Sequence, residues 1–309
     1  MKRIVTMLSV LLLTVVMGTA CGEETGGSED DRLMVVATTG QIHDALRNIG
    51  GAAIELHGLL GPGIDPHLYV PTEGNVQLFS DADMIVYNGL NLEAQMVRVL
   101  GQMADRGAIV VALGEALPEE RLLRQPAGTV DPHVWNDPAL WSIGVNAILE
   151  ALVDADPDNA ALYRANAETY LAEVAAADAY VAEQVARIAP DKRILITAHD
   201  AFGYFANAYG MKVYGIQGIS TESEASTADL QNLAEIIVTN QVPAVFVETS
   251  VSPRTIEALQ AAVANQGFDV AIGGQLFSDA LGETGHPAET YIGMLRHNSQ
   301  TIADALADS

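Results

Sequence analysis

The stretch that decides the fold is PDNAALYRANAETYLAEVAAADAYVAEQVARI, residues 157–188. It holds no proline after its first position and Pro190 follows it, so one long helix is predicted over 157–189, capped by Asp156. At 1.5 Å per residue this helix would be about 48 Å long. Such a helix is rigid, so we expect limited motion between the parts that it joins. Its apolar side chains recur at helical spacing: Leu162, Ala165, Tyr170, Val174, Ala177, Val181, Val185 and Ile188.

Short β-branched runs, each followed by a helical pattern, lie on both sides of this helix. Strands that alternate with helices predict parallel sheets with covered faces. We therefore predict an α/β protein of two similar lobes, at 33–156 and 190–309, bridged by the long helix. Each lobe is expected to be a mainly parallel four-stranded sheet with flanking helices. The predicted strands are 33–38, 53–60, 84–87 and 108–113 in the first lobe, and 193–197, 212–216, 244–248 and 269–273 in the second.

The N-terminus is typical of an export signal. A basic start precedes an apolar run from Ile4 to Val16, and small residues lead into Cys21. This order predicts a signal peptide over 1–21, cleaved in lipobox fashion before Cys21, which is then lipidated. Gly18 departs from the usual lipobox, so an ordinary secretory peptide with an incidental cysteine stays open. The polar, acidic residues 22–32 predict a flexible tether, and the mature chain is expected to contain no other hydrophobic run long enough to cross a membrane.

Charge and cysteine content exclude several classes of protein. The chain has 309 residues, with 40 Asp and Glu against 15 Lys and Arg, which gives a net charge of −25. Such an acidic chain repels phosphate, so no nucleic-acid partner is expected. With 1 cysteine, the chain has no intrachain disulfide, no CxxC redox pair and no cysteine-based zinc finger.

Three of the 7 histidines lie where a predicted strand meets a loop. His67 follows the second strand, His133 precedes a helix, and His199 ends the fifth strand, while Asp279 follows the eighth. Ligands of open α/β sheets bind outside the carboxyl ends of the strands, so two facing lobes would bring these side chains together. Three imidazoles and a carboxylate suit zinc, manganese or ferrous iron. The sequence therefore predicts a metal site formed by His67, His133, His199 and Asp279.

The tripeptide Asp-Pro-His occurs twice, at 65–67 and 131–133. Proline stiffens each loop, and the aspartate is expected to anchor it by accepting hydrogen bonds from backbone N–H groups. The other four histidines are His43, His57, His297 and His286. They are predicted to be incidental to the metal site, although His286, which lies in a loop, is a spare candidate for a ligand.

Longer motifs around these residues resemble one family. They are GPGIDPHLY at 61–69, DPHVW at 131–135, TAHDAFGYF at 197–205, GISTESEAS at 218–226 and LFSDALG at 276–282. Together they resemble the metal-binding solute-binding lipoproteins of bacterial zinc and manganese ABC transporters, the cluster A-I family, over nearly the whole mature chain.

The resemblance implies two lobes bridged by one helix, with the metal between them on His67, His133, His199 and Asp279. It implies a monomeric receptor, not an enzyme, that captures a divalent metal and delivers it to the membrane subunits of an ABC permease. It also implies an exported lipoprotein, anchored through Cys21 at the outer face of the cytoplasmic membrane or in the periplasm. Adhesion to a host surface, sometimes ascribed to relatives, is neither supported nor excluded by the sequence.

The cargo is expected to be Zn²⁺, with Mn²⁺ as the alternative. Three nitrogen ligands and one oxygen favour zinc by ligand softness and by intrinsic affinity. Within the family, receptors regarded as manganese-dedicated often carry Glu where His199 stands. Dedicated zinc receptors usually carry a His/Asp-rich loop before the second ligand histidine, and residues 113–130 contain no histidine.

An exported zinc-dependent hydrolase is the alternative from a different class. It needs an open metal position and a nearby general base, such as Glu222 or Glu248. No HExxH or GxSxG motif is present. Glu224 is expected to face solvent, whereas Glu248 is expected to be structural or to bond a ligand histidine.

Overall fold

The computed structural model describes residues 32–125 and 128–307. The predicted signal peptide, Cys21 and nearly all of the predicted tether lie outside the described residues, so the expectations for them are not addressed by the structure.

The first lobe is built on a four-stranded parallel sheet in the order β2-β1-β3-β4. Alternate residues of its strands face opposite cores, as the pleat of a strand requires: Val35 and Met84 pack with α1 and α4, whereas Val36 and Ile85 pack with α2 and α3. The elements are β1 (Leu33–Ala37), α1 (Gly40–Gly50), β2 (Ile54–Gly58), α2 (Glu73–Asp81), β3 (Met84–Tyr87), α3 (Val97–Asp105), β4 (Ile109–Ala112) and α4 (Pro138–Ala155).

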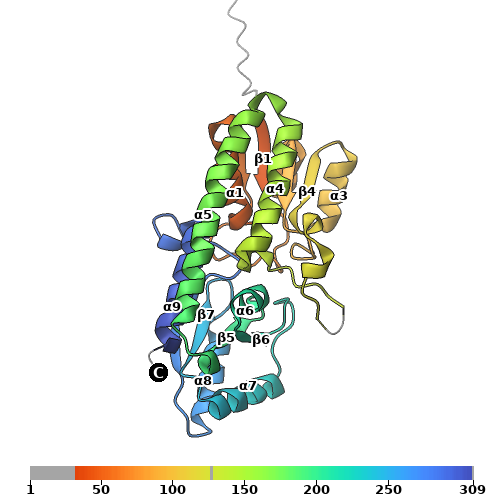
Figure 1. The fold of residues 1–309 in the computed structure, drawn as a ribbon. Helices are drawn as coiled ribbons and strands as arrows, with labels where there is room; N and C mark the ends of the chain where they lie inside the picture. The colour runs from red at the N-terminus through yellow and green to blue at the C-terminus, as the bar shows by residue number, and fades with distance from the viewer. Residues whose placement is uncertain (1–31, 126–127, 308–309) are drawn as a thin grey trace, which may run out of the picture. The chain divides into compact units, whose positions relative to one another are not determined.

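The long helix α5 (Ala160–Ala186) packs against α1 and α4 of the first lobe and α9 of the second (Figure 1). It begins three residues after the predicted start at Pro157, because a 3₁₀ turn occupies Pro157–Asn159. The Asp156 carboxylate accepts from the Asn159 side chain at 2.8 Å and from the Tyr163 hydroxyl at 2.6 Å, so it does not cap a backbone N–H of this helix.

The buried stripe of α5 differs from the predicted one near the start of the helix. Leu162, expected in the core, is 44% exposed, and Tyr163 is fully buried in its place. Farther along, the predicted positions are buried: Tyr170, Val174, Ala177, Val181 and Val185.

The second lobe holds parallel pairs rather than one continuous four-stranded ladder. Strands β5 and β6 pair with each other, as do β7 and β8, while β5 and β7 lie in contact. At the end of β5 the His199 N–H donates to the carboxylate of Glu248 on β7, so a side chain takes the place of a ladder bond there. The elements are β5 (Ile194–His199), α6 (Gly203–Tyr209), β6 (Lys212–Gln217), α7 (Thr227–Asn240), β7 (Ala244–Glu248), α8 (Arg254–Ala264), β8 (Ala271–Leu276) and α9 (Tyr291–Ala307).

The predicted α/β class with two lobes is confirmed. The expectation that no later segment has the make-up of a membrane span is wrong, because α4 is long and apolar enough by length and composition. Its side chains Trp141, Val145 and Ile148 are instead buried in the core that also contains α5. Asp137 caps α4 by accepting from two backbone N–H groups, and Pro138 occupies its first turn, as a helix opening there predicts.

Candidate metal centre

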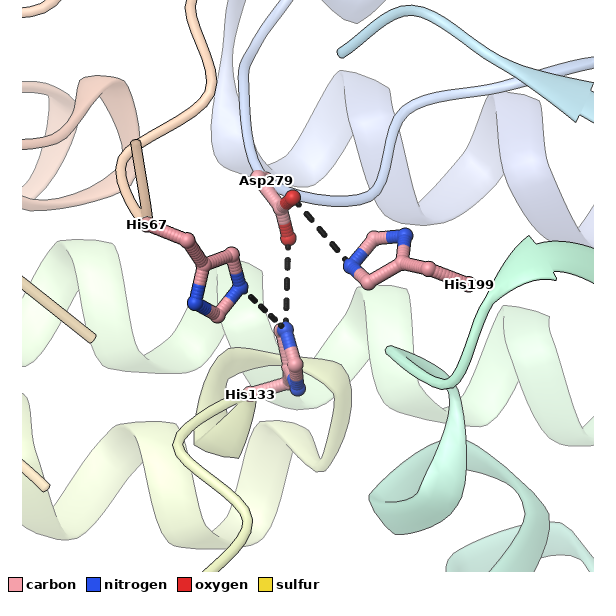
Figure 2. A group of neighbouring side chains, drawn as sticks. All are labelled: His67, His133, His199 and Asp279. Carbon is pink, nitrogen blue, oxygen red and sulfur yellow. Dashed lines mark hydrogen bonds and ion pairs between the residues drawn. The ribbon is translucent and has the colours of Figure 1, made fainter. Parts of the chain in front are cut away.

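The four predicted side chains converge at one point between the lobes (Figure 2). His67 lies in the loop after β2, His133 directly before a 3₁₀ turn at Val134–Asn136, His199 at the end of β5, and Asp279 just after β8. Their ligand atoms all lie within 4.8 Å of one another. Each residue is buried, with exposed fractions of 3%, 0%, 0% and 2% in that order.

The spacing of the ligand atoms suits a tetrahedral ion. His67 Nε2 lies 3.2 Å from His133 Nε2, and the Asp279 oxygens lie 3.4 Å from His133 Nε2 and 3.2 Å from His199 Nε2. Zinc bonds of about 2.0–2.1 Å in a tetrahedron put neighbouring ligand atoms about 3.3 Å apart. These three distances match that spacing, so the residues present fit a four-coordinate metal.

Both Asp-Pro-His loops are anchored as predicted. The Asp65 carboxylate accepts from the His67 N–H at 2.8 Å, and the Asp131 carboxylate accepts from the His133 N–H at 2.9 Å. The second loop has a further contact, because the same Asp131 oxygen lies 2.7 Å from His133 Nδ1. A proton on Nδ1 donates to Asp131, which leaves the lone pair of Nε2 for a metal.

Glu248 contacts both the backbone and the ring of His199. One of its oxygens accepts from the His199 N–H at 2.9 Å, and the other lies 2.5 Å from His199 Nδ1. Glu248 is 2% exposed, which matches the predicted role of a partner to a ligand histidine. Glu224 is exposed, as expected, and Glu222 is an exposed residue that accepts a hydrogen bond from Gln95 at 3.2 Å.

Electrostatics distinguish the histidines of this cluster from one another. Burial lowers the pKa of His67 to about 4, although the Asp279 carboxylate opposes this shift. Burial also acts to lower the pKa of His199, but the carboxylates of Asp279 and Glu248 outweigh it and raise that pKa well above 6.5. Burial would raise the pKa of Asp279, yet the neighbouring histidines hold it well below its usual range. The Asp279 carboxylate is therefore ionised and available to a cation.

The other four histidines lie apart from this group. His43, His57 and His297 lie on α1, β2 and α9, as predicted. The spare candidate, His286, caps a 3₁₀ turn through its Nδ1 and packs its ring on Phe277 at 5.0 Å. Within residues 32–125 and 128–307, the cluster of three histidines and Asp279 is the one group of three or more potential ligands close enough to share an ion.

Several contacts that support the site are not predicted from the sequence. The indole N–H of Trp135 donates to the Ser278 carbonyl at 2.8 Å, and the Tyr291 hydroxyl donates to the Trp135 carbonyl at 2.7 Å. The Asn88 side chain donates to the Pro132 carbonyl at 3.0 Å. Buried Glu93 in turn accepts from the Asn88 N–H at 2.8 Å. Trp135 lies inside a quoted motif, but nothing local in the sequence identifies its partner.

The geometry does not favour the hydrolytic alternative. Both oxygens of Glu248 are occupied by His199, and Glu222 is exposed and bonded to Gln95, so neither proposed base is free beside the site. Four protein ligands complete a tetrahedron, whereas a catalytic zinc keeps one position for water. The arrangement is suited to holding an ion.

Two α/β lobes, a helix that packs against both, and a buried His₃Asp cluster between them define a solute-binding protein for a metal ion. The chain belongs to the family of the periplasmic component A of the zinc-uptake complex, ZnuA, whose family model matches residues 35–305. This family consists of transport proteins rather than enzymes, which confirms the predicted class.

Named relatives are similar over most of their length. The zinc-binding protein TroA of Treponema pallidum is 44% identical over 279 residues, covering 90% of each chain. The manganese-binding lipoprotein MntA of Bacillus subtilis is 43% identical over 304 residues, covering 97% of this chain and 98% of MntA. The solved structure of TroA superposes with a TM-score of 0.88 and covers 89% of this chain and 99% of TroA.

Proposed function

We propose that this chain is an extracytoplasmic receptor that captures a divalent transition metal between its lobes and delivers it to an ABC permease. The observation that carries the proposal is the buried cluster of His67, His133, His199 and Asp279, whose ligand atoms all lie within 4.8 Å of one another. The named relatives support it, since TroA is described as zinc-binding and MntA as manganese-binding.

The four ligands have different roles in binding the metal. His133 and His199 offer Nε2 atoms whose rings are held by Asp131 and Glu248, so they reach the ion already oriented. Asp279 offers the anionic oxygen, which partly neutralises the charge of the divalent ion in a buried place.

Zinc is the favoured cargo and manganese the alternative. Nitrogen-rich ligand sets bind zinc more tightly than manganese, because intrinsic affinity rises along the first-row series. The two relatives above are about equally similar to this chain yet are named for different metals, so similarity alone does not choose between them.

We further propose that the receptor is exported and membrane-anchored through a lipidated Cys21, with residues 22–32 as the tether. Several relatives are described as lipoproteins, which supports this placement. The first lobe at 33–156, the linking helix at 157–189, the second lobe at 190–309 and a monomeric state complete the proposal. Palmitate labelling of the parent and of Cys21→Ser tests the anchor, since label in both chains would contradict it.

Elemental analysis tests the metal site. Chelator-stripped protein is rebound in equimolar Zn²⁺ and Mn²⁺, and bound metal per chain is measured by ICP-MS. We expect one equivalent, mostly zinc, in the parent, and loss of metal in single alanine variants at His67, His133, His199 and Asp279. His286→Ala is the matched control, because His286 is a loop histidine outside the cluster. A parent that retains no metal would sink the proposal.

A further inference from the structure

The three ligand histidines are not supported equally. The ring Nδ1 of His133 contacts Asp131, and that of His199 contacts Glu248. His67 differs, because its contacts among the described residues are a backbone bond to Asp65 and its Nε2 contact inside the cluster. Its ring orientation therefore depends on where the loop itself is held.

That loop has solvent on its outer side. Ile64, Leu68 and Val70 are apolar, and they are 41%, 52% and 66% exposed. Packing of these three side chains against the first lobe therefore contributes little to fixing the loop.

The second lobe holds the loop by a hydrogen bond from Thr221. The Thr221 hydroxyl donates to one oxygen of Asp65 at 2.5 Å, while the other Asp65 oxygen accepts from the His67 N–H at 2.8 Å. Nearby, Gly63 has a φ of +70°, and a Cβ placed there would lie 3.4 Å from the Thr249 carbonyl oxygen. Thr221 is 8% exposed and lies in the loop after β6, within a motif that supplies no ligand to the cluster.

We propose that Thr221 is a positioning residue that holds Asp65, and through it His67, in the geometry needed to retain the metal. The inference rests on the proposed function. The Asp65 carboxylate bridges the lobes: one oxygen fixes the backbone of the ligand histidine, and the other is bonded to the opposite lobe. When the Thr221 bond is absent, the His67 loop is free to move outward and the ion leaves faster.

Stopped-flow release of zinc into excess chelator tests this role. Removing a hydrogen bond to a charged group, as in Thr221→Val, is expected to raise the dissociation rate about 10-fold. Zinc stoichiometry stays at one, and Thr221→Ser restores the parent rate because it keeps the hydroxyl. Thr255→Val is the control, since its hydroxyl bonds only to the Ser252 carbonyl within its own lobe. Equal rates in the parent and Thr221→Val would overturn the proposal, as would a serine variant as fast as the valine variant.

Two further measurements separate this role from a general loss of stability. Hydrogen exchange of the metal-free protein should quicken at residues 67–70 in Thr221→Val and stay unchanged in α5. A cycle with Asp65→Ala should be non-additive in zinc release, because both changes break one chain of bonds; additive effects would contradict the proposal. A parent that binds no zinc defeats the proposed function, whereas a parent that binds zinc but matches Thr221→Val defeats only this inference.

Discussion

The indole N–H of Trp135 donates to the carbonyl oxygen of Ser278 at 2.8 Å, so one hydrogen bond joins the loops of two ligands from different lobes. Trp135 lies two residues after His133, and Ser278 directly precedes Asp279. Both residues are buried, and the bond is therefore shielded from water. The relative position of the two lobes at the metal is set in part by this contact.

Trp135→Phe should weaken both the fold and the metal site. The change leaves the buried Ser278 carbonyl without its donor, which costs about 1–3 kcal/mol of unfolding free energy. We also expect zinc affinity to fall about 10-fold, since the two ligand loops lose their link. Denaturant unfolding and a chelator-competition titration measure the two effects.

Trp141→Phe is the matched control for that change. Trp141 is equally buried but packs its ring on Tyr291 at 4.9 Å instead of bonding to a metal-site loop. It should lose stability from the lost volume while keeping its zinc affinity. Equal affinity losses in both variants would refute the linking role of Trp135.

Glu248→Gln should lower zinc affinity by about 10–100-fold, the usual cost of disturbing a carboxylate that supports a ligand histidine. The amide cannot match a carboxylate that contacts both the backbone N–H and the ring Nδ1 of His199. Glu222→Gln, at an exposed residue, should leave affinity unchanged. Isothermal titration of the three proteins provides the comparison, and an unaffected Glu248→Gln would contradict the assignment.

Zinc should stabilise the protein more as the pH rises. In the metal-free protein the folded pKa of His199 is raised, so its contribution to stability is full below about pH 6.5 and is lost as the pH rises through the folded pKa. Zinc needs the neutral ring and displaces that proton, so binding weakens as the pH falls. His67 is already neutral in the folded protein above its pKa of about 4, so it adds little to the pH dependence of zinc binding.

Thermal melts with and without zinc at pH 6, 7 and 8 measure this dependence. The zinc-induced increase in Tm should be larger at each higher pH. This pH dependence should be weaker in Glu248→Gln, because one of the two carboxylates that raise the pKa of His199 is then neutral. A Tm increment that falls with pH would contradict the account.

His199→Glu should shift the bound metal from zinc toward manganese, because carboxylate ligands suit manganese better than imidazole does. We expect about a 10-fold drop in the zinc-to-manganese ratio in equimolar competition, read by ICP-MS. The new carboxylate would face Glu248, whose oxygen lies 2.5 Å from the present ring Nδ1, so total occupancy should also fall. Adding Glu248→Gln removes this like-charge contact and should restore occupancy; an unchanged metal ratio in both variants would exclude tuning at this position.

Much of the fold follows from local patterns. His199 ends a β-branched run, and His67 and Asp279 lie in the loops that follow two other such runs. The repeated Asp-Pro-His tripeptide predicts its own backbone anchors. The four ligand candidates therefore lie close together, as expected. Metal binding by these residues stays a prediction.

Other features depend on contacts between distant residues. The helix α5 begins three residues after the predicted start, and Asp156 bonds the Tyr163 hydroxyl instead of capping this helix, which a sequence pattern does not show. The Thr221–Asp65 bond joins residues 156 positions apart, and the Trp135–Ser278 bond joins residues 143 apart. The contact of Glu248 on β7 with His199 on β5 likewise joins residues 49 positions apart.

The helix α5 has a consequence for how a transporter can tell a full receptor from an empty one. A single helix that packs on both lobes holds them rigidly and does not act as a hinge, so metal binding should change the overall shape of the described residues very little. Scattering curves of the two states would then nearly coincide. The permease would then distinguish the metal-bound receptor from the metal-free one only by local structure near the ion. Metal-free receptors would compete with metal-bound ones for the same docking site on the permease.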